Sequence, residues 1–275
     1  MPYLKTEDAD IYFEVQGEGP WLLFLHGAGG NSASWWQQIP FFTEHFKCIF
    51  IDNRYFGRSI IKKDSVLNID KFTQDTLYVL DHLKADNIGI VSQSMGGWIG
   101  LRLILKNQDR FWGFVSSNSP MGIDHKKSIE NILNFSSAND NETSRVEHAA
   151  LSENFIKEKP YLFEAYRQIG SFNKASHMKI NNRPFFSELM GELLRNEFLI
   201  EENELNELKT PTLIIGGDMD PLMPAYSSME ISNIIPNSKL VIFENCGHSP
   251  YFEFPEIFNR LVYEYLTECI KNNLN

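Results

Sequence analysis

The sequence predicts an α/β protein with a mostly parallel central sheet and flanking helices, on the basis of two observations. Short apolar runs rich in β-branched and aromatic residues alternate with longer runs of helical period along most of the 275 residues. One such run, Trp21–Leu25, is almost entirely apolar, which is typical of a strand covered on both faces. A chain of this length with 43% hydrophobic residues can bury a sizeable core without disulfides or metal.

The order of the patterns divides the chain into a core and an insertion. Strands are expected over residues 12–15, 21–25, 46–51, 88–91, 111–115, 211–215 and 240–243, and helices over 69–83, 96–106 and 256–270. Between 119 and 208 no strand pattern occurs, and helical patterns appear at 129–135, 160–169 and 185–199. We therefore expect a core made of residues 1–118 and 209–275, with residues 119–208 as a helical cap inserted after the sixth strand.

Composition and charge exclude several classes of partner. The formal net charge of -11 disfavours nucleic acid and anionic membrane surfaces, both of which attract basic patches. No segment reaches the roughly 18–20 continuous apolar residues that span a membrane. Three cysteines without a C-x-x-C pair (Cys48, Cys246 and Cys269) fit a reducing compartment, and the acidic N-terminal residues do not resemble a signal peptide. We expect a cytoplasmic protein with no metal site.

The segment Ile88–Gly97 contains two serines, Ser92 and Ser94, and residue size decides between them as nucleophile. A serine presented on a sharp strand-to-helix turn needs small residues two positions before and after it. The flanks of Ser92 would include the bulky Ile90, whereas those of Ser94 are Ser92 and Gly96. Ser94 is therefore the predicted nucleophile, although a serine that merely caps a Gly-Gly helix start would give the same pattern.

A glycine-rich turn, Leu25-His-Gly-Ala-Gly-Gly30, follows another predicted strand. Acyl transfer requires two N–H groups directed at the developing oxyanion. A His-Gly-x-Gly turn is a usual source of one N–H group, and the residue after the serine supplies the other. Ala28 and Met95 are therefore the predicted oxyanion-hole donors. A phosphate loop is disfavoured because neither G-x-G-x-x-G nor G-K-[ST] is present.

The predicted acid and base follow the last two strands of the core. Asp220 lies in the turn after residues 211–215 and is preferred to its neighbour Asp218, which an Asx turn would explain. Of the seven histidines, only His248 lies in a Gly-His-Ser-Pro loop beyond a strand. An acid that orients a histidine, which in turn activates a serine, forms a nucleophilic triad.

These residues together resemble the α/β-hydrolase fold family. The order Ser94, Asp220, His248 is the family's order of nucleophile, acid and base, and the resemblance covers nearly the whole chain, from Tyr12 to Tyr265. The segment 52–59 is similar to the family's Asp-x-Arg-Gly-x-Gly-x-Ser loop, except that Tyr55 replaces the first glycine. Ser92 likewise stands where the family usually has glycine.

The resemblance is closest to cap-bearing carboxylesterases, enol-lactonases and carbon–carbon bond hydrolases. It implies an α/β-hydrolase fold and cleavage of a small, apolar ester or lactone through an acyl-enzyme, with no cofactor. Two alternatives remain open: a carbon–carbon hydrolase or lyase with the same triad, and a ligand-binding receptor on a hydrolase fold. The expected partner is a small-molecule substrate, and the chain is expected to be a monomer or a homodimer.

Aromatic residues near the motifs are candidates for the substrate pocket. Trp35 follows the glycine-rich turn, Trp98 lies four residues after Ser94, and Phe135 and Tyr166 belong to the cap. Pockets for small apolar ligands are lined mainly by such side chains. Packing of cap against core would require the same residue types, so any one of these rings could serve either purpose.

Overall fold

The structure is a computed structural model that describes residues 3–62, 67–137, 149–173, 179–180 and 183–273. Within these residues, nine strands form one sheet, and all neighbours from β4 to β11 along it are parallel. The order across the sheet is β1 (Tyr3–Lys5), β2 (Ala9–Gln16), β4 (Lys47–Ile51), β3 (Trp21–Leu25), β6 (Ile88–Gln93), β7 (Phe111–Ser117), β10 (Thr212–Gly217) and β11 (Ser238–Phe243). The short β5 (Ile60–Ile61) pairs with β2, which runs antiparallel to β4. The mostly parallel α/β sheet predicted from the sequence is confirmed.

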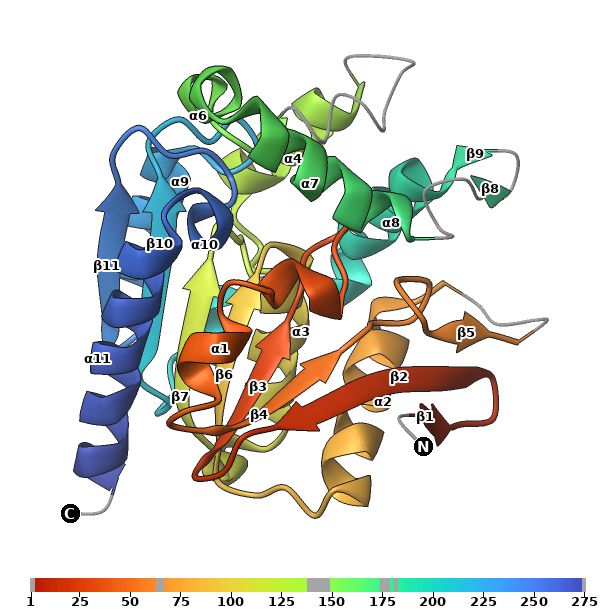
Figure 1. The fold of residues 1–275 in the computed structure, drawn as a ribbon, viewed down its shortest axis with the longest axis vertical. Helices are drawn as coiled ribbons and strands as arrows, with labels where there is room; N and C mark the ends of the chain where they lie inside the picture. Colours follow the sequence, from red (N-terminus) through yellow and green to blue (C-terminus); the bar gives the residue numbers. More distant parts are fainter. Residues whose placement is uncertain (1–2, 63–66, 138–148, 174–178, 181–182, 274–275) are drawn as a thin grey trace.

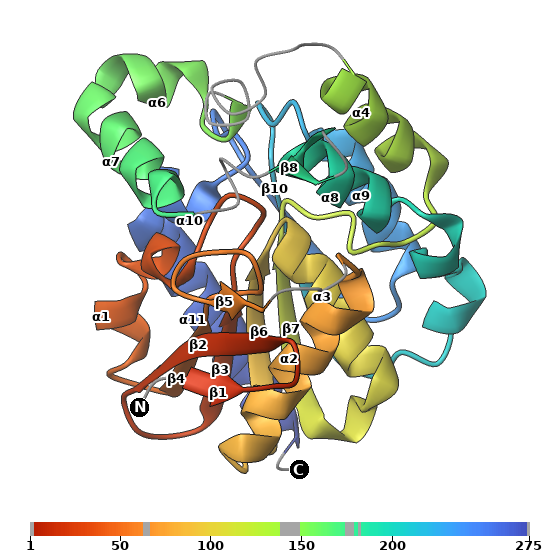
Figure 2. The same ribbon diagram turned by 90° about the vertical axis from the view of Figure 1, so that its right-hand side faces the viewer.

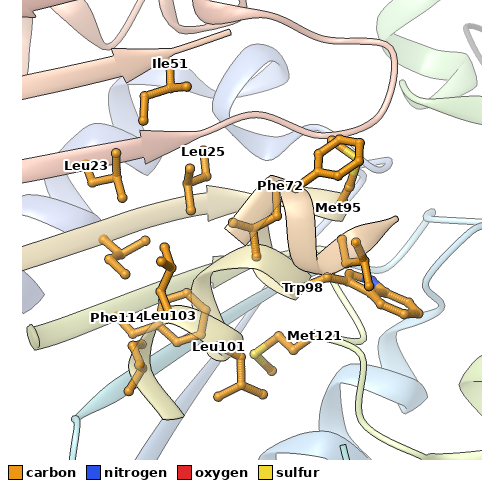
Figure 3. Close-up of a cluster of buried hydrophobic side chains, with 14 of the residues drawn as sticks. Leu23, Leu25, Ile51, Phe72, Met95, Trp98, Leu101, Leu103, Phe114 and Met121 are labelled. Carbon is orange, nitrogen blue, oxygen red and sulfur yellow. The ribbon is translucent and has the colours of Figure 1, made fainter. Parts of the chain in front are cut away.

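Helices cover both faces of the sheet, as Figures 1 and 2 show. On one face lie α1 (Ile39–Phe42) and α11 (Pro255–Asn273), and on the other lie α2 (Ile69–His82), α3 (Met95–Lys106) and α9 (Ala225–Ile234). Because side chains alternate along a strand, β3 contributes to two separate cores. Leu23 and Leu25 pack in the core that contains α3, whereas Leu22 and Phe24 pack toward α11. Figure 3 shows the first of these cores.

The segment between β7 and β10 forms a layer at the carboxyl ends of the parallel strands (Figure 1). It contains α4 (Lys126–Ser137), α6 (Glu153–Glu158), α7 (Pro160–Ser171), β8 (Lys179–Ile180), β9 (Arg183–Pro184) and α8 (Phe185–Leu193). Figure 2 shows α6 and α7 as one group and α4 and α8 as another. Short 3-10 helices occur at Ser32–Trp35, Gln108–Arg110, Asn196–Phe198 and Glu202–Leu205.

Several local expectations differ from the structure. The insertion follows the seventh of the described strands rather than the sixth, because β1 and β5 at the sheet edge add two strands to the five ranges expected before residue 119. The strand-free insertion contains the two-residue pair β8–β9, and the helix expected over 185–199 ends at Leu193. Helices α6 and α9 were not predicted. Pairs and helices this short carry too few residues for a periodic pattern.

A buried ion pair joins the loop after β4 to α2. Arg54, 1% exposed, donates from Nε and Nη2 to the two carboxylate oxygens of Asp75 at 2.7 and 2.9 Å. Burial raises the pKa of Asp75, and the Arg54 guanidinium opposes that rise. The pair fixes the loop that starts at Asp52, next to the glycine-rich turn.

Replacing Arg54 by methionine is expected to destabilise the fold by about 3–5 kcal/mol, because Asp75 would remain buried without its partner. Urea unfolding at neutral pH measures the loss. Lys106→Met is the matched control: its pair with Asp70 is half exposed on both sides, so a loss below about 1 kcal/mol is expected. Equal losses in the two variants would contradict this account of the Arg54–Asp75 pair.

Candidate active site

Five loops that follow parallel strands supply the candidate site. Neighbouring parallel strands end at the same edge of a sheet, so residues that follow them are brought together. The loops begin after β3, β6, β7, β10 and β11, and they carry Ala28, Ser94, Asn118, Asp220 and His248 respectively.

Ser94 stands at the sharp turn between β6 and α3. Its φ of 50° and ψ of -119° lie in a region that non-glycine residues rarely adopt, and its N–H donates to Ser117 O at 2.9 Å. Such strain costs on the order of 1–3 kcal/mol and is concentrated at functional sites. A side chain at Gly96 would place its Cβ 2.1 Å from Leu25 O, so this flank must be glycine.

The other serine has a structural role. Ser92 is fully buried in β6 and its hydroxyl donates to Val115 O at 2.9 Å, whereas Ser94 is partly exposed. A bonded, fully buried hydroxyl is not available to a substrate. The structure therefore places Ser94, and not Ser92, where a nucleophile would stand.

Asp220 and His248 form a buried, hydrogen-bonded pair. His248 Nδ1 lies 2.7 Å from Asp220 Oδ2, and because a carboxylate only accepts, the imidazole donates. Asp220 Oδ1 accepts from the N–H groups of Leu222 and Met223 at 2.8 and 3.0 Å. The competing Asp218 is exposed and accepts from Cys246 N at 3.2 Å. Of the two aspartates, only Asp220 is paired with the histidine.

Asn118, which sequence analysis missed, completes the surroundings of the acid. Its Nδ2 donates to Asp220 Oδ2 at 2.8 Å, the same oxygen that His248 uses, and lies 3.3 Å from Gly247 O. It is fully buried and has a φ of 50°. The available signal was a polar residue directly after a buried parallel strand, the signal that also indicated Ser94 and Asp220.

Contacts between the loops hold the predicted nucleophile and base together. Gln93 Nε2, one residue before Ser94, donates to His248 O at 3.1 Å. A Cβ on Gly27 would lie 2.0 Å from Gln93 Oε1 and 3.0 Å from Ser94 Cβ, so the glycine-rich turn packs directly on the elbow. The loops after β3, β6 and β11 are therefore in contact, and the bond between His248 and Asp220 adds the loop after β10.

His26 fixes the direction of the Ala28 N–H group. Its Nε2 accepts from Asn53 N at 3.0 Å, so the proton is on Nδ1, which donates to Gly27 O at 2.8 Å. Burial lowers the pKa of His26, which favours this neutral form. Gly30 N also donates to Gly27 O, at 3.1 Å. Since a trans peptide is planar, holding Gly27 O also orients the Ala28 N–H on its opposite side.

Met95 N is the first helical N–H of α3, a position that has no acceptor within its own helix. The positive end of the helix dipole lies there as well, which favours an anion. Both predicted donors thus lie in segments of fixed backbone, on loops that contact Ser94.

A buried carboxylate braces the histidine loop. Glu253, 1% exposed, accepts from Gly247 N at 2.8 Å through Oε1, and from Ser152 Oγ and N at 2.6 and 3.1 Å through Oε2. Burial raises the pKa of Glu253, and the hydrogen bonds from Ser152 and Gly247 counteract that rise. Ser152 caps α6, so Glu253 ties the insertion to the loop of His248.

Cys246 is not a competing nucleophile. Its thiol is fully buried beside Glu253, and burial together with nearby carboxylates raises its pKa well above the ordinary value. Only a thiolate is strongly nucleophilic. Packing in the core therefore accounts for this residue.

The four aromatic candidates for the pocket lie in different surroundings. Trp35 is fully buried, 5.3 Å from Phe24 and 4.8 Å from Tyr251 between ring centroids, and belongs to the core that includes α11. Trp98 is 3% exposed and packs in the core of Figure 3. The side chain of Phe135 lies outside the described residues.

Tyr166 is the candidate that contacts the loop of His248. Its hydroxyl is 3.3 Å from Ser249 Oγ, one residue after His248, and its ring packs edge-on against Phe252 at 5.0 Å. It is partly exposed on α7. Of the three described candidates, it alone contacts a loop of the site.

Tyr55 is buried in the core and does not face solvent. It is 6% exposed and packs 5.2 Å from Phe185 of α8. Its φ of 72° is a conformation that glycine adopts without strain, which explains why the family pattern has glycine there. The aromatic ring thus offsets the backbone strain with a contact between core and insertion.

The described residues contain neither a metal-binding cluster nor a membrane-spanning helix. No group of three or more His, Cys, Asp or Glu side chains among them is placed to hold a metal ion. Nor does any helix within the described ranges have the length and apolar character to cross a membrane.

Comparison with known proteins assigns the fold family. Residues 20–255 match the family model described as alpha/beta hydrolase fold. The chain belongs to the α/β hydrolase fold family.

Individual relatives are distant but matched along nearly their full length. The chain is 24% identical over 274 residues to the pimeloyl-[acyl-carrier protein] methyl ester esterase of Nitrosomonas europaea, covering 91% of this chain and 97% of that protein. Among solved structures, a thermophilic esterase from Thermogutta terrifontis superposes with a TM-score of 0.78 at 22% identity, covering 95% of this chain and 94% of the other. The enol-lactonase from Burkholderia xenovorans LB400 superposes with a TM-score of 0.78 at 19% identity, covering 97% and 100%.

Proposed function

We propose that the protein is a serine hydrolase that cleaves a small, apolar ester or lactone, with Ser94 as nucleophile, His248 as base and Asp220 as acid. The observation that carries the proposal is the buried His248–Asp220 pair at 2.7 Å, on loops that contact the strained turn of Ser94. Strain at the serine and an oriented imidazole are the two features that activate a hydroxyl for attack.

The reaction proceeds through a covalent acyl-enzyme. Ser94 Oγ attacks the carbonyl carbon while its proton passes to His248 Nε2, and the carbonyl oxygen becomes an oxyanion. The N–H groups of Ala28 and Met95 stabilise that charge. When the tetrahedral intermediate collapses, the bond to the leaving group breaks and His248 gives the proton to the leaving oxygen. Water then attacks the acyl-enzyme by the same sequence, which releases the acid and restores the Ser94 hydroxyl.

The relatives support cleavage of an ester or lactone bond. The named relatives act on a methyl ester and an enol-lactone, and one is an esterase, as their names state. An uncharged substrate fits the surroundings of the triad, since the described contacts of Asp220 and His248 are with uncharged groups apart from each other. The net charge of -11 also disfavours a strongly anionic substrate.

We also propose that residues 119–208 act as a cap over this site. The helices of the insertion lie at the carboxyl edge of the sheet, where the triad loops are (Figure 1). The three cysteines are free and buried, which supports location in a reducing compartment such as the cytoplasm.

The test is a substrate series combined with covalent labelling of the wild-type protein. Hydrolysis of p-nitrophenyl esters of increasing acyl length and of five- and six-membered lactones is measured, and a fluorophosphonate-treated sample is mapped by fragment-ion mass spectrometry. We expect turnover of short esters or lactones and a label on Ser94. Labelling without turnover of either class would move the activity to carbon–carbon bonds or to ligand reception, and a label on Ser92, or no label, would overturn the proposal.

A further inference from the structure

We propose that Asn173, at the end of α7, is a positioning residue for the oxyanion turn, so that the cap helix α7 sets the geometry of the oxyanion hole. This inference rests on the function proposed above. Asn173 directly follows the last turn of α7, its N–H donating to Gly170 O at 3.0 Å. It is fully buried, which is unusual for an asparagine outside a regular element.

The side-chain amide of Asn173 bonds to both loops that adjoin the predicted hole. Its Oδ1 accepts from Gly57 N at 2.7 Å, and its Nδ2 donates to Gly29 O. Because Gly57 N–H can only donate and Gly29 O can only accept, the amide has one possible orientation. The donor end therefore faces the glycine-rich turn, and the acceptor end faces the loop that begins at Asp52.

A second asparagine connects the same turn to α7. Asn31 Nδ2 donates to Ile169 O at 2.9 Å and to Asn173 Oδ1 at 3.2 Å, while Asn31 Oδ1 accepts from Ala33 N at 3.0 Å. Asn31 is also fixed by its own N–H, which donates to Ser34 Oγ at 3.1 Å. The end of α7 is thus bonded to the glycine-rich turn at two places, at Gly29 through Asn173 and at Asn31 through Ile169 O.

The bond to Gly29 O complements the bonds to Gly27 O. In the turn from Gly27 to Gly30, His26 Nδ1 and Gly30 N hold Gly27 O, the carbonyl of the peptide that carries the Ala28 N–H. Asn173 holds Gly29 O, the carbonyl of the peptide between Gly29 and Gly30. Gly29 has a φ of 88°, so its flanking peptides could otherwise rotate at little cost. With Gly27 O and Gly29 O both held, the turn cannot rotate at Gly29 and carry Ala28 with it, so the Ala28 N–H keeps the fixed direction that an oxyanion donor requires.

Two substitutions separate positioning from simple structural support. Asn173→Ala removes the side-chain bonds to Gly57 N, Gly29 O and Asn31 Nδ2. Asn173→Asp keeps the size and the acceptor for Gly57 N and Asn31, but it places a carboxylate oxygen against Gly29 O and a negative charge near the developing oxyanion. If Asn173 only supports the fold, the aspartate variant retains more contacts and should be the more active of the two. If Asn173 positions the oxyanion hole, the alanine variant should be the more active of the two.

We expect kcat to fall about 10-fold in Asn173→Ala and about 100-fold in Asn173→Asp, with KM changed less than about threefold, since mispositioned transition-state donors act on kcat. The affinity for a trifluoromethyl ketone analogue, which forms a tetrahedral adduct with the serine, should fall in the same order. The affinity for the corresponding methyl ketone should not change. Ser171→Ala is the matched control: this exposed residue on the same helix bonds only to Gln168 O, at 2.7 Å, among the described contacts.

Fluorophosphonate labelling of the wild type is measured first, because it separates a failure of the proposed hydrolase function from a failure of the role of Asn173. A wild type that is neither labelled nor active would remove the proposed function itself. A labelled, active wild type with Asn173→Asp as active as Asn173→Ala or more so, or with the loss confined to KM, would overturn the role of Asn173 alone. Thermal unfolding and near-ultraviolet circular dichroism verify that each variant is folded; if Asn173→Ala does not fold, the aspartate variant measured against wild type carries the test.

Discussion

Replacing Ser94 by alanine is expected to lower kcat/KM for the best ester by about 10⁴–10⁶-fold and to abolish fluorophosphonate labelling. Loss of the nucleophile removes the covalent route, and only binding and the oxyanion donors remain to accelerate attack by water. The comparison is made with the wild type at saturating and limiting substrate, with active-site titration to exclude contaminating esterase.

The unfolding temperature of Ser94→Ala tests, independently of activity, whether this substitution leaves the fold intact. Ser94 has a φ of 50°, and its side chain makes no contact that alanine would lose in the described hydrogen bonds. Ser94→Ala should therefore unfold at the wild-type temperature, and Ser94→Gly should be more stable because glycine adopts this conformation without strain. An alanine variant that keeps more than about 1% of the activity would remove Ser94 from the mechanism.

The site residues that sequence analysis predicted share a local signal. Ser94, Asp220 and His248 each follow a parallel strand of the sheet and stand among small or turn-forming residues. Parallel strands bring such positions to one edge of the sheet, whatever the sequence separation between them. Placement at one edge therefore followed from strand patterns alone, and the distances between the side chains did not.

Residues that hold the site together had no comparable signal. Asn173 and Glu253 act through partners far away in the sequence: Asn173 contacts Gly29 and Gly57, and Glu253 contacts Ser152. A single asparagine or glutamate within a helical pattern has the same appearance as a solvated one. Only the packing of the insertion on the core shows that both are fully buried.

The direction in which the aromatic candidates point could not be predicted from the sequence either. Trp35 and Trp98 lie near the motifs in sequence, but the side chain of Trp35 points into the core that contains α11 and that of Trp98 into the core that contains α3. Proximity to a motif along the chain does not determine direction, because direction depends on the turn of the helix on which the residue lies. Tyr166, far from His248 in sequence, contacts Ser249, the residue that follows it.

Replacing Asp220 by asparagine is expected to lower kcat by about 10⁴-fold with little change in the fold. The N–H groups of Leu222 and Met223 can only donate, so they require the amide oxygen of the new side chain in the place of Oδ1. The amide nitrogen must then face His248 Nδ1 and donate to it. In the wild type, His248 Nδ1 carries the proton and is itself the donor. The imidazole is forced into the tautomer with its proton on Nε2, and this nitrogen can no longer take the Ser94 proton.

Asn118 does not prevent this outcome. Its amide can rotate to present an oxygen to the second hydrogen of the new side chain, because its own present partner Ser117 Oγ can either donate or accept. The substitution therefore satisfies the hydrogen bonds of Leu222 N, Met223 N and Ser117 Oγ and loses only the 3.3 Å bond from Asn118 Nδ2 to Gly247 O, while it inverts the histidine. Catalysis is thus affected far more than stability. Asp218→Asn is the matched control: Asp218 is exposed, and the one described bond of its side chain, from Cys246 N, is one that an amide oxygen also accepts. Full activity in Asp220→Asn, or equal losses at the two positions, would show that His248 is oriented by another group.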